Sequence, residues 1–369
     1  MSAAGGINVK HLNSSISNCS TVEALMQLVE RHGASFNFIH VSTALTRAAK
    51  LMQAPLSADE EACIAQLLRI AGRQLEECGA WALANMAWAL AKLGYKDTAF
   101  MQQLVQQAGV QLPRFEAQNT ANTLWALARL GYEDKAFMQQ LLAHARSQHL
   151  RQHFNSQELS NIFWAMAKLQ HVAEDRQLVQ DLLEHAEPQL PRFSQQALAN
   201  TAWALATLRH YDQRFMEQLL QHSVAKLAGF DSQNVTNTLW ALANFGHNDP
   251  EFVDRAVQQL LTLDLREVQR QALCNVLWAL SMLQHNAAAV VVPLIACAAA
   301  DLKSPPGRSN TEQHSCQIHQ HLGATGQGQP HFHLHILVFC YLHSLSITAA
   351  WQLPDSWQYH HDERVGAAA

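Results

Sequence analysis

The chain has 369 residues, of which 49% are apolar and only 15% charged, so it can bury a large core and is not broadly disordered. Its 15 Gly and 10 Pro are few for this length, which argues against a turn-rich all-β protein, and we expect an all-α fold. The formal net charge of −5 excludes a polycationic surface, so any nucleic-acid binding must come from locally placed side chains.

The first 19 residues carry few structural signals. Lys10 is their only basic side chain and they contain no long apolar run, so we expect a flexible N-terminus without a secretory signal or a clear transit peptide. The seven cysteines of the chain include no Cys-x-x-Cys pair, which is typical of a protein in a reducing compartment.

From about residue 20 to residue 302 the sequence repeats itself. Six tryptophans recur at intervals of 37, 39, 39, 37 and 38 residues: Trp88, Trp125, Trp164, Trp203, Trp240 and Trp278. A seventh, degenerate copy ends at Leu51 and has Thr46 in place of the Trp. A fixed period of this length predicts a solenoid, in which each unit packs only against its neighbours.

Each repeat is expected to contain two helices. The first begins about nine residues before the Trp, where N-cap residues such as Asn155, Ser194 and Asp231 stand, and it ends at the sixth residue after the Trp, where Gly suits a left-handed conformation. An Asp that caps a second helix recurs nine residues after the Trp in most copies. We therefore predict an α-solenoid of about seven stacked helical hairpins.

These residues also resemble a known family. The period, the Phe-x-x-Gln starts and the Asn-x-x-Trp-Ala-Leu-Ala-x-Leu-Gly body are similar to octotricopeptide repeats, helical-hairpin modules of organelle gene expression, and the similarity extends over most of the chain. The resemblance implies sequence-selective binding of single-stranded RNA, with effects on RNA stability, processing or translation. It further implies a chloroplast location, with the mitochondrion as second choice, and other RNA-processing proteins as partners. DNA and membrane partners are not expected.

A polar stripe on the first helix is the predicted RNA-binding surface. With the Trp as position 0 and 100° per residue, positions −7, −3 and +4 lie within about 60° of it. Asn occupies −3 in all six copies, including Asn85 and Asn275, Gln is usual at −7, including Gln271, and +4 varies, ending with Met282. The candidate RNA-binding residues are Lys92, Gln118, Asn122, Arg129, Gln157, Asn161, Lys168, Gln196, Asn200, Thr207, Gln233, Asn237 and Asn244.

The sequence leaves two interpretations open at each stripe position. The invariant Asn forms either an amide ladder between repeats or contacts to base edges, and the ladder is favoured because a recognition position should vary from repeat to repeat. The variable +4 residue either binds RNA or is a solvated helix face. The Trp either stacks on bases or, as the sequence favours, packs in the groove between repeats, where its indole N–H can bond the Asn ladder.

After Lys303 the repeat stops, and residues 303–369 are expected to form a poorly ordered, His-rich tail. The pairs Cys316-x-x-His319 and Cys340-x-x-His343 have zinc-ligand spacing but lie in a His-rich context, and the apolar run 334–350 contains two His, so we predict neither a metal site nor a membrane span. Motifs for nucleotide hydrolysis, acyl transfer and metalloproteolysis are missing, so we expect no enzyme and no cofactor. The rival function is a protein-binding helical scaffold without RNA contact.

Overall fold

The computed structural model describes residues 9–147, 153–169 and 176–285, and every regular element in these ranges is a helix. The predicted all-α fold is thereby confirmed. The chain divides into two compact units, unit 1 with residues 1–226 and unit 2 with residues 227–369. Repeats one to five belong to unit 1 and repeats six and seven to unit 2. The predicted tail, residues 303–369, lies outside the described residues.

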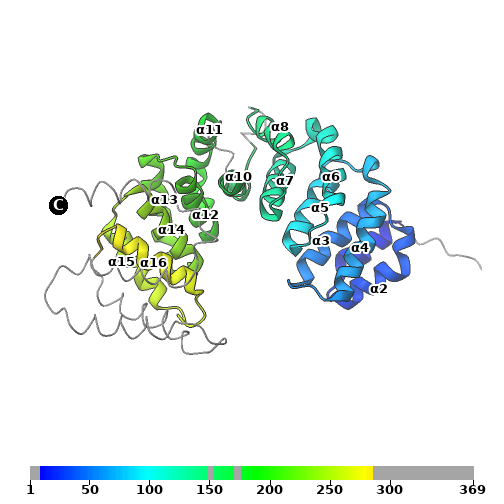
Figure 1. Cartoon of the computed structure of the whole chain (residues 1–369), viewed down its shortest axis with the longest axis horizontal. Coiled ribbons are helices and arrows are strands. Elements are labelled where there is room, and N and C mark those ends of the chain that lie inside the picture. Colours follow the sequence, from blue (N-terminus) through cyan, green and yellow to red (C-terminus); the bar gives the residue numbers. More distant parts are fainter. Residues whose placement is uncertain (1–8, 148–152, 170–175, 286–369) are drawn as a thin grey trace, which may run out of the picture. The chain divides into compact units, whose positions relative to one another are not determined.

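Each of the first six repeats contains the two predicted helices, and the described part of the seventh contains its first helix (Figure 1). The first helices of unit 1 are α3 (Phe38–Leu51), α5 (Ala80–Leu93), α7 (Ala117–Leu130), α10 (Ser156–Leu169) and α12 (Gln195–Thr207). Its second helices are α4 (Ala58–Gly72), α6 (Thr98–Gln111), α8 (Lys135–Ala145), α11 (Arg176–Ala186) and α13 (Gln213–Lys226). Unit 2 contains α14 (Ser232–Phe245), α15 (Pro250–Leu261) and α16 (Arg270–Met282). Short 3₁₀ turns, such as Leu112–Arg114, join several hairpins to the next repeat.

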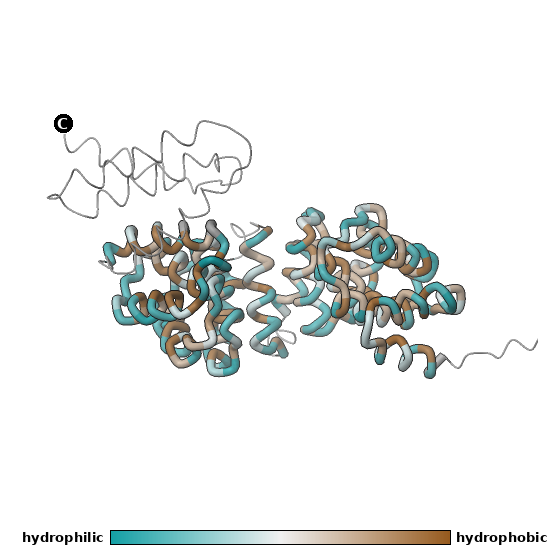
Figure 2. Tube along the Cα trace, turned by 90° about the horizontal axis from the view of Figure 1, so that it is seen from below, coloured by the Kyte–Doolittle hydropathy of each residue, from teal (hydrophilic) through white to brown (hydrophobic). Residues whose placement is uncertain are grey.

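The core consists of the apolar positions that the repeat places away from the stripe. Large apolar residues at −5, −1 and +2 of the first helices are buried, as are pairs such as Phe137 and Met138 on the second helices. Figure 2 shows the resulting alternation of hydrophobic and hydrophilic residues along individual helices. Because neither helix can bury its apolar face alone, each hairpin depends on its neighbours for stability.

Small residues let the first helices of neighbouring repeats approach closely. In the six Trp-containing repeats, positions +1 and +3 are Ala, apart from Ser281, and all of them are buried. Within unit 1, α3, α5, α7, α10 and α12 pack against one another in succession and lie closer together than the second helices do. In unit 2, α14 and α16 pack in the same way. Each inner first helix therefore buries two flanks and its back, and one stripe stays accessible.

The N-terminus differs from our expectation. Residues 1–19 were expected to be flexible, but Val9–Asn18 form helix α1, which packs on α3, and Val22–His32 form α2. Leu12 and Ile16, one turn apart on α1, are buried against this neighbour. The physical reason is that α3 begins the series of repeats and would otherwise expose an apolar flank, which terminal capping elements cover in repeat proteins.

The predicted helix caps are confirmed where the structure describes them. The carboxylates of Asp97, Asp134, Asp212 and Asp249 each accept a hydrogen bond from the backbone N–H three residues later, at 2.9 to 3.0 Å. Glu116, Ser194 and Asp231 are the N-caps of their first helices. In repeat four the corresponding Asp, Asp175, stands two residues later than in the other copies and lies outside the described residues. Most of these helices thus carry their own start signal, whereas α5 and α16 begin without a side-chain cap.

The left-handed ends of the first helices are also confirmed. Gly94, Gly131 and Gly246 have φ of 68°, 64° and 63°, and Arg209 and Gln284 adopt φ of 51° and 52° at the same position. A Cβ added to Gly131 would meet no atom within 4 Å, so only the backbone conformation requires glycine there.

A second hydrogen-bond pattern fixes the loop that enters several of the first helices. The residue at −10 is a buried Phe in five repeats, and its carbonyl accepts a hydrogen bond from a side chain at the end of the second helix. Gln74 bonds Phe36, His144 bonds Phe115, and Gln259 bonds Phe230, at 2.9 to 3.0 Å. In repeat four, His185 and Gln189 both bond the carbonyl of Phe154. In repeat five, Lys226 bonds the carbonyl of Phe193. We did not foresee this bond from the sequence, because its donors differ in type and spacing.

The residue after the left-handed position is Tyr or His, and in repeat five it is His210. Its Nε2 hydrogen-bonds Gln180 Oε1 on α11 at 3.1 Å, which connects repeats five and four. Burial lowers the pKa of His210; Asp212 opposes this shift and Arg176 adds to it.

We predict that Gly131→Ala and Gly109→Ala change stability in opposite directions. Ala at position 131 must adopt a left-handed conformation, which should lower the free energy of unfolding by about 1 kcal/mol. Gly109 lies inside α6 with ordinary space for a Cβ, so Ala there should raise it by about 0.5–1 kcal/mol. Urea unfolding followed by far-UV circular dichroism measures both, and destabilisation of equal size by the two changes would contradict the assignment.

We also predict that His210 makes the protein sensitive to acid. The pKa of His210 in the folded protein lies below the ordinary value of about 6.5. Its contribution to stability is therefore complete above about pH 6.5 and is lost as the pH falls from there through the folded pKa. His210→Tyr introduces the residue that repeats two and three have at this position, Tyr95 and Tyr132. The variant should lose less of its urea midpoint between pH 7.5 and pH 5.5 than the parent, and an identical loss would count against this role.

Candidate nucleic-acid interface

The predicted stripe residues share one accessible surface within each unit. At −7, Gln118, Gln157, Gln196 and Gln233 are exposed. At −3, all six Asn, including Asn122, Asn161, Asn200 and Asn237, are half-buried. At +4, Lys92, Arg129, Lys168, Asn244 and Met282 are exposed and Thr207 is half-buried. The side chain of Gln271 is outside the described set.

The Trp row lies on the stripe itself. All six Trp are half-buried, so the expected packing between repeats is only partly realised and each indole keeps an accessible portion. The rings of Trp125 and Trp164, from successive repeats, have centroids 6.3 Å apart and planes tilted by 37°. An aromatic pair at this separation stabilises the stack by about 0.5–1.5 kcal/mol beyond its burial.

The favoured amide ladder is not formed in four of the six Trp-containing repeats. The side chains of Asn85, Asn122, Asn200 and Asn237 make no hydrogen bond to any residue that the structure describes. Asn161 accepts a bond from Gln157 of its own helix at 3.0 Å. The physical reason is that position −3 lies on the half-buried stripe, whereas the flanks where helices meet carry the buried small residues. The amides of Asn85, Asn122, Asn200 and Asn237 are therefore available to a ligand.

Other side chains provide hydrogen bonds between first helices. The Oγ of Ser42 donates to the carbonyl of Ala82 at 3.4 Å, and the Oγ of Ser160 donates to the carbonyl of Ala197 at 3.3 Å. Both donors are buried at position −4, next to position −3 and on the packed flank. In these two repeats, position −4 thus provides the bonding between repeats that the ladder interpretation assigned to −3.

A row of unpaired cations runs along unit 1. Lys92, Arg129 and Lys168 form no ion pair with any described residue, and Lys50 occupies the same +4 position on α3 and is also exposed. The sequence reading missed Lys50 because repeat one lacks the Trp that sets the register. No Asp or Glu occupies positions −7, −3, 0 or +4 in the five repeats of unit 1, all of which are described. The stripe is therefore locally basic although the chain is acidic.

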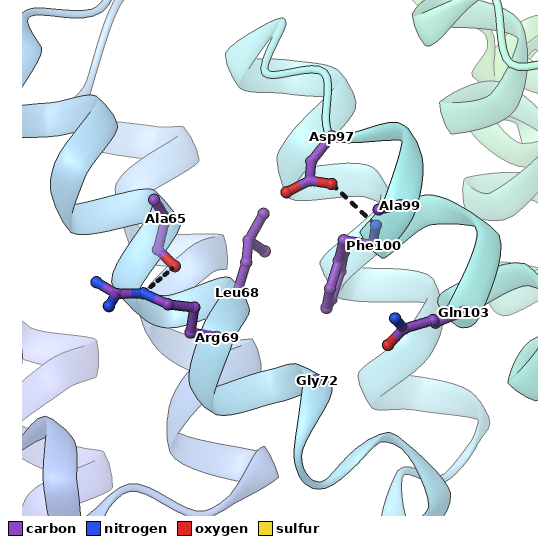
Figure 3. A pocket seen from close by; sticks show the side chains of 8 residues that line it. All are labelled: Ala65, Leu68, Arg69, Gly72, Asp97, Ala99, Phe100 and Gln103. Atoms are coloured by element: carbon purple, nitrogen blue, oxygen red, sulfur yellow. Dashed lines mark hydrogen bonds between the residues drawn. The ribbon is translucent and has the colours of Figure 1, made fainter.

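The second helices offer a different kind of surface. A depression of about 310 Å³ between α4 and α6 is lined by apolar Leu68 and Phe100 and by polar Arg69, Asp97 and Gln103 (Figure 3). The Asp97 carboxylate caps α6 through the N–H of Phe100, and Arg69 Nε donates to the carbonyl of Ala65. Because its charged groups already serve their own helices, this depression lacks the convergent free polar groups of a ligand site.

The described residues contain no cluster of three side chains able to hold a metal ion, and none of their helices has the length and apolar character needed to cross a bilayer. The Cys-x-x-His pairs and the apolar run 334–350 lie outside the described residues. Burial raises the pKa of Cys63 and of Cys78 to about 11, so both thiols stay protonated at neutral pH.

Two family models match parts of the chain. Residues 128–295 are similar to the family described as Tbc2 translation factor, N-terminal domain, and residues 70–175 to the RNA-editing substrate-binding complex 6 protein. Each match covers less than half of the chain. Together they extend over all six Trp-containing repeats, and no curated protein matches the chain.

We predict that Asn122→Ala and Trp125→Ala separate accessible from structural stripe residues. Asn122 forms no bond that holds repeats together, so Ala should leave stability unchanged or raise it by about 0.5 kcal/mol through helix propensity. Trp125 packs on Trp164, and its loss should destabilise unit 1 by about 2 kcal/mol. Thermal unfolding measures both, and a large loss of stability in the Asn122 variant would restore the ladder interpretation.

Proposed function

We propose that the stripe formed by the first helices binds single-stranded RNA in a sequence-selective manner. The observation that carries the proposal is the unpaired row of Lys50, Lys92, Arg129 and Lys168 beside half-buried indoles and accessible amides. Cations suit phosphates, indole faces suit stacked bases, and Asn or Gln amides suit base edges. An acidic or apolar stripe, which would favour a peptide ligand, is not what unit 1 presents.

The comparisons support an RNA-related role for this chain. One matching family is named for translation and the other for binding an RNA-editing substrate. We propose on this basis, and on the repeat resemblance, that the chain is an octotricopeptide repeat protein that acts in RNA stability, processing or translation. The resemblance places this work in an organelle, with the chloroplast first and the mitochondrion second. The protein acts by binding and not by catalysis.

The repeat geometry sets the extent of the site. By analogy with other helical repeat readers, each repeat binds about one nucleotide, so six to seven repeats give a footprint of about six to seven nucleotides. The +4 residue differs between repeats and is the candidate for selectivity, whereas the Asn at −3 is common to the six Trp-containing repeats and suits a contact that every nucleotide offers. Selection of RNAs from a random single-stranded pool tests this, and a failure to enrich any motif would overturn it in favour of a protein-binding scaffold.

We predict that replacing Arg129 and Lys168 together by Ala weakens RNA binding and makes it less sensitive to salt. Loss of two phosphate contacts should reduce the slope of log K against log salt concentration by about 1.4 for a single strand. Fluorescence anisotropy with a labelled random RNA pool at several salt concentrations measures the slope.

A matched control removes the same number of positive charges from the second helices. Arg69→Ala with Lys135→Ala alters two exposed cations on the second helices α4 and α8. This pair should leave both affinity and salt slope close to those of the parent. Equal effects from the two double variants would mean that the stripe is not the binding surface.

A further inference from the structure

Trp81 is unusual among the tryptophans of the repeats. It occupies position −7 of α5, where the four described repeats that follow have an exposed Gln, and it is 52% exposed. A large indole left open on a helix surface adds nothing to the core, and its size suits a flat aromatic ligand. Helix formation does not require Trp at this position, since Gln occupies it in the neighbouring repeat.

The surroundings of Trp81 belong to the proposed RNA-binding stripe. Asn85, Trp88 and Lys92 follow on the same stripe of α5, so one helix presents an indole, an amide, a second indole and a cation. The two indoles are separated by seven residues, about 10.5 Å along the helix axis. A cation, an amide and an aromatic face match the phosphate, edge and face of a nucleotide.

Trp81 also marks the place where the repeated pattern ends. On the preceding first helix, α3, the same positions are Ile39, Thr43 and Thr46, so repeat one has neither the Asn nor the Trp of the later repeats. Ile39 is 41% exposed and lies in register with Trp81 on the helix that packs against α5. The series of amides thus stops at α5. The stripe of the neighbouring helix α3 has no Asn or Trp, and Lys50 is its only charged residue.

We propose that Trp81 stacks on the nucleobase at this end of the bound strand and selects a purine there. This inference rests on the proposed function. Stacking accepts any base but is strongest for the larger ring system of a purine, and the apolar Ile39 beyond it has no groups that read a base edge. The end of the site therefore fixes the register of the strand by stacking, while the inner repeats use amides and cations.

Selection from a random pool of single-stranded RNA tests the proposal, with the full chain as parent and Trp81→Gln as the variant. Gln is the residue of the other repeats at this position, so the fold should be retained, which circular dichroism verifies. The parent motif should have a purine-enriched position at one end. The Trp81→Gln motif should lose that enrichment and keep the inner positions. A variant motif with the same terminal purine preference would overturn the proposal.

Affinity measurements on an RNA that carries the selected motif provide the second test. Trp81→Ala should weaken binding roughly tenfold, and Trp81→Phe should recover most of the loss because it restores a stacking face. Val110→Ala removes another exposed apolar side chain, on the second helix α6, and should have no effect. Unchanged affinity of all Trp81 variants would overturn the stacking role and assign this patch to a protein partner.

The outcomes separate this inference from the proposed function. If the parent enriches no RNA motif, the proposed function fails and the inference fails with it. If the parent enriches a motif and the Arg129 and Lys168 double variant weakens binding, while Trp81→Gln selects the same sequence as the parent, the proposed function stands and only the role of Trp81 is wrong.

Discussion

The close approach of neighbouring first helices is the constraint on which the rest of the structure depends. Buried Ala at +1 and +3 permits it, because larger side chains would push apart helices such as α5 and α7 where they meet. Once both flanks and the back of a helix are buried, only the stripe at −7, −3, 0 and +4 remains accessible. The position of every candidate RNA contact is therefore a consequence of where the helices need small residues.

This constraint also explains why a polar residue, Asn, is found at −3 in the middle of the first helices. Asn has a lower helix propensity than Ala, by about 0.5 kcal/mol, and in four of the six Trp-containing repeats no hydrogen bond to a described residue offsets this cost. Ser42 and Ser160, one residue away, provide such bonds from the packed flank. A cost that recurs at Asn85, Asn122, Asn200 and Asn237 without a structural return is typical of residues kept for a ligand.

Local signals in the sequence were sufficient for the fold, and less so for the surface. The period, the Asp97 type of N-cap and the glycines such as Gly131 predict the hairpins because each depends on contacts within a few residues. The helix α1, the carbonyl bonds to residues such as Phe115 and the exposure of Trp81 depend on which neighbour covers which flank. Periodicity places a residue on a face, but it does not say how deeply the next repeat buries it.

The self-contained caps of each hairpin bear on how such a protein changes over generations. Asp at the start of a second helix and a left-handed residue at the end of a first helix lie within a single period, so duplicating or deleting one period joins equivalent positions and creates no new chemistry at the junction. Unequal recombination can thus lengthen or shorten the array by whole hairpins without redesign of the packing. Copy number, more than substitution, then becomes the inherited variable that sets how long a ligand the array accommodates.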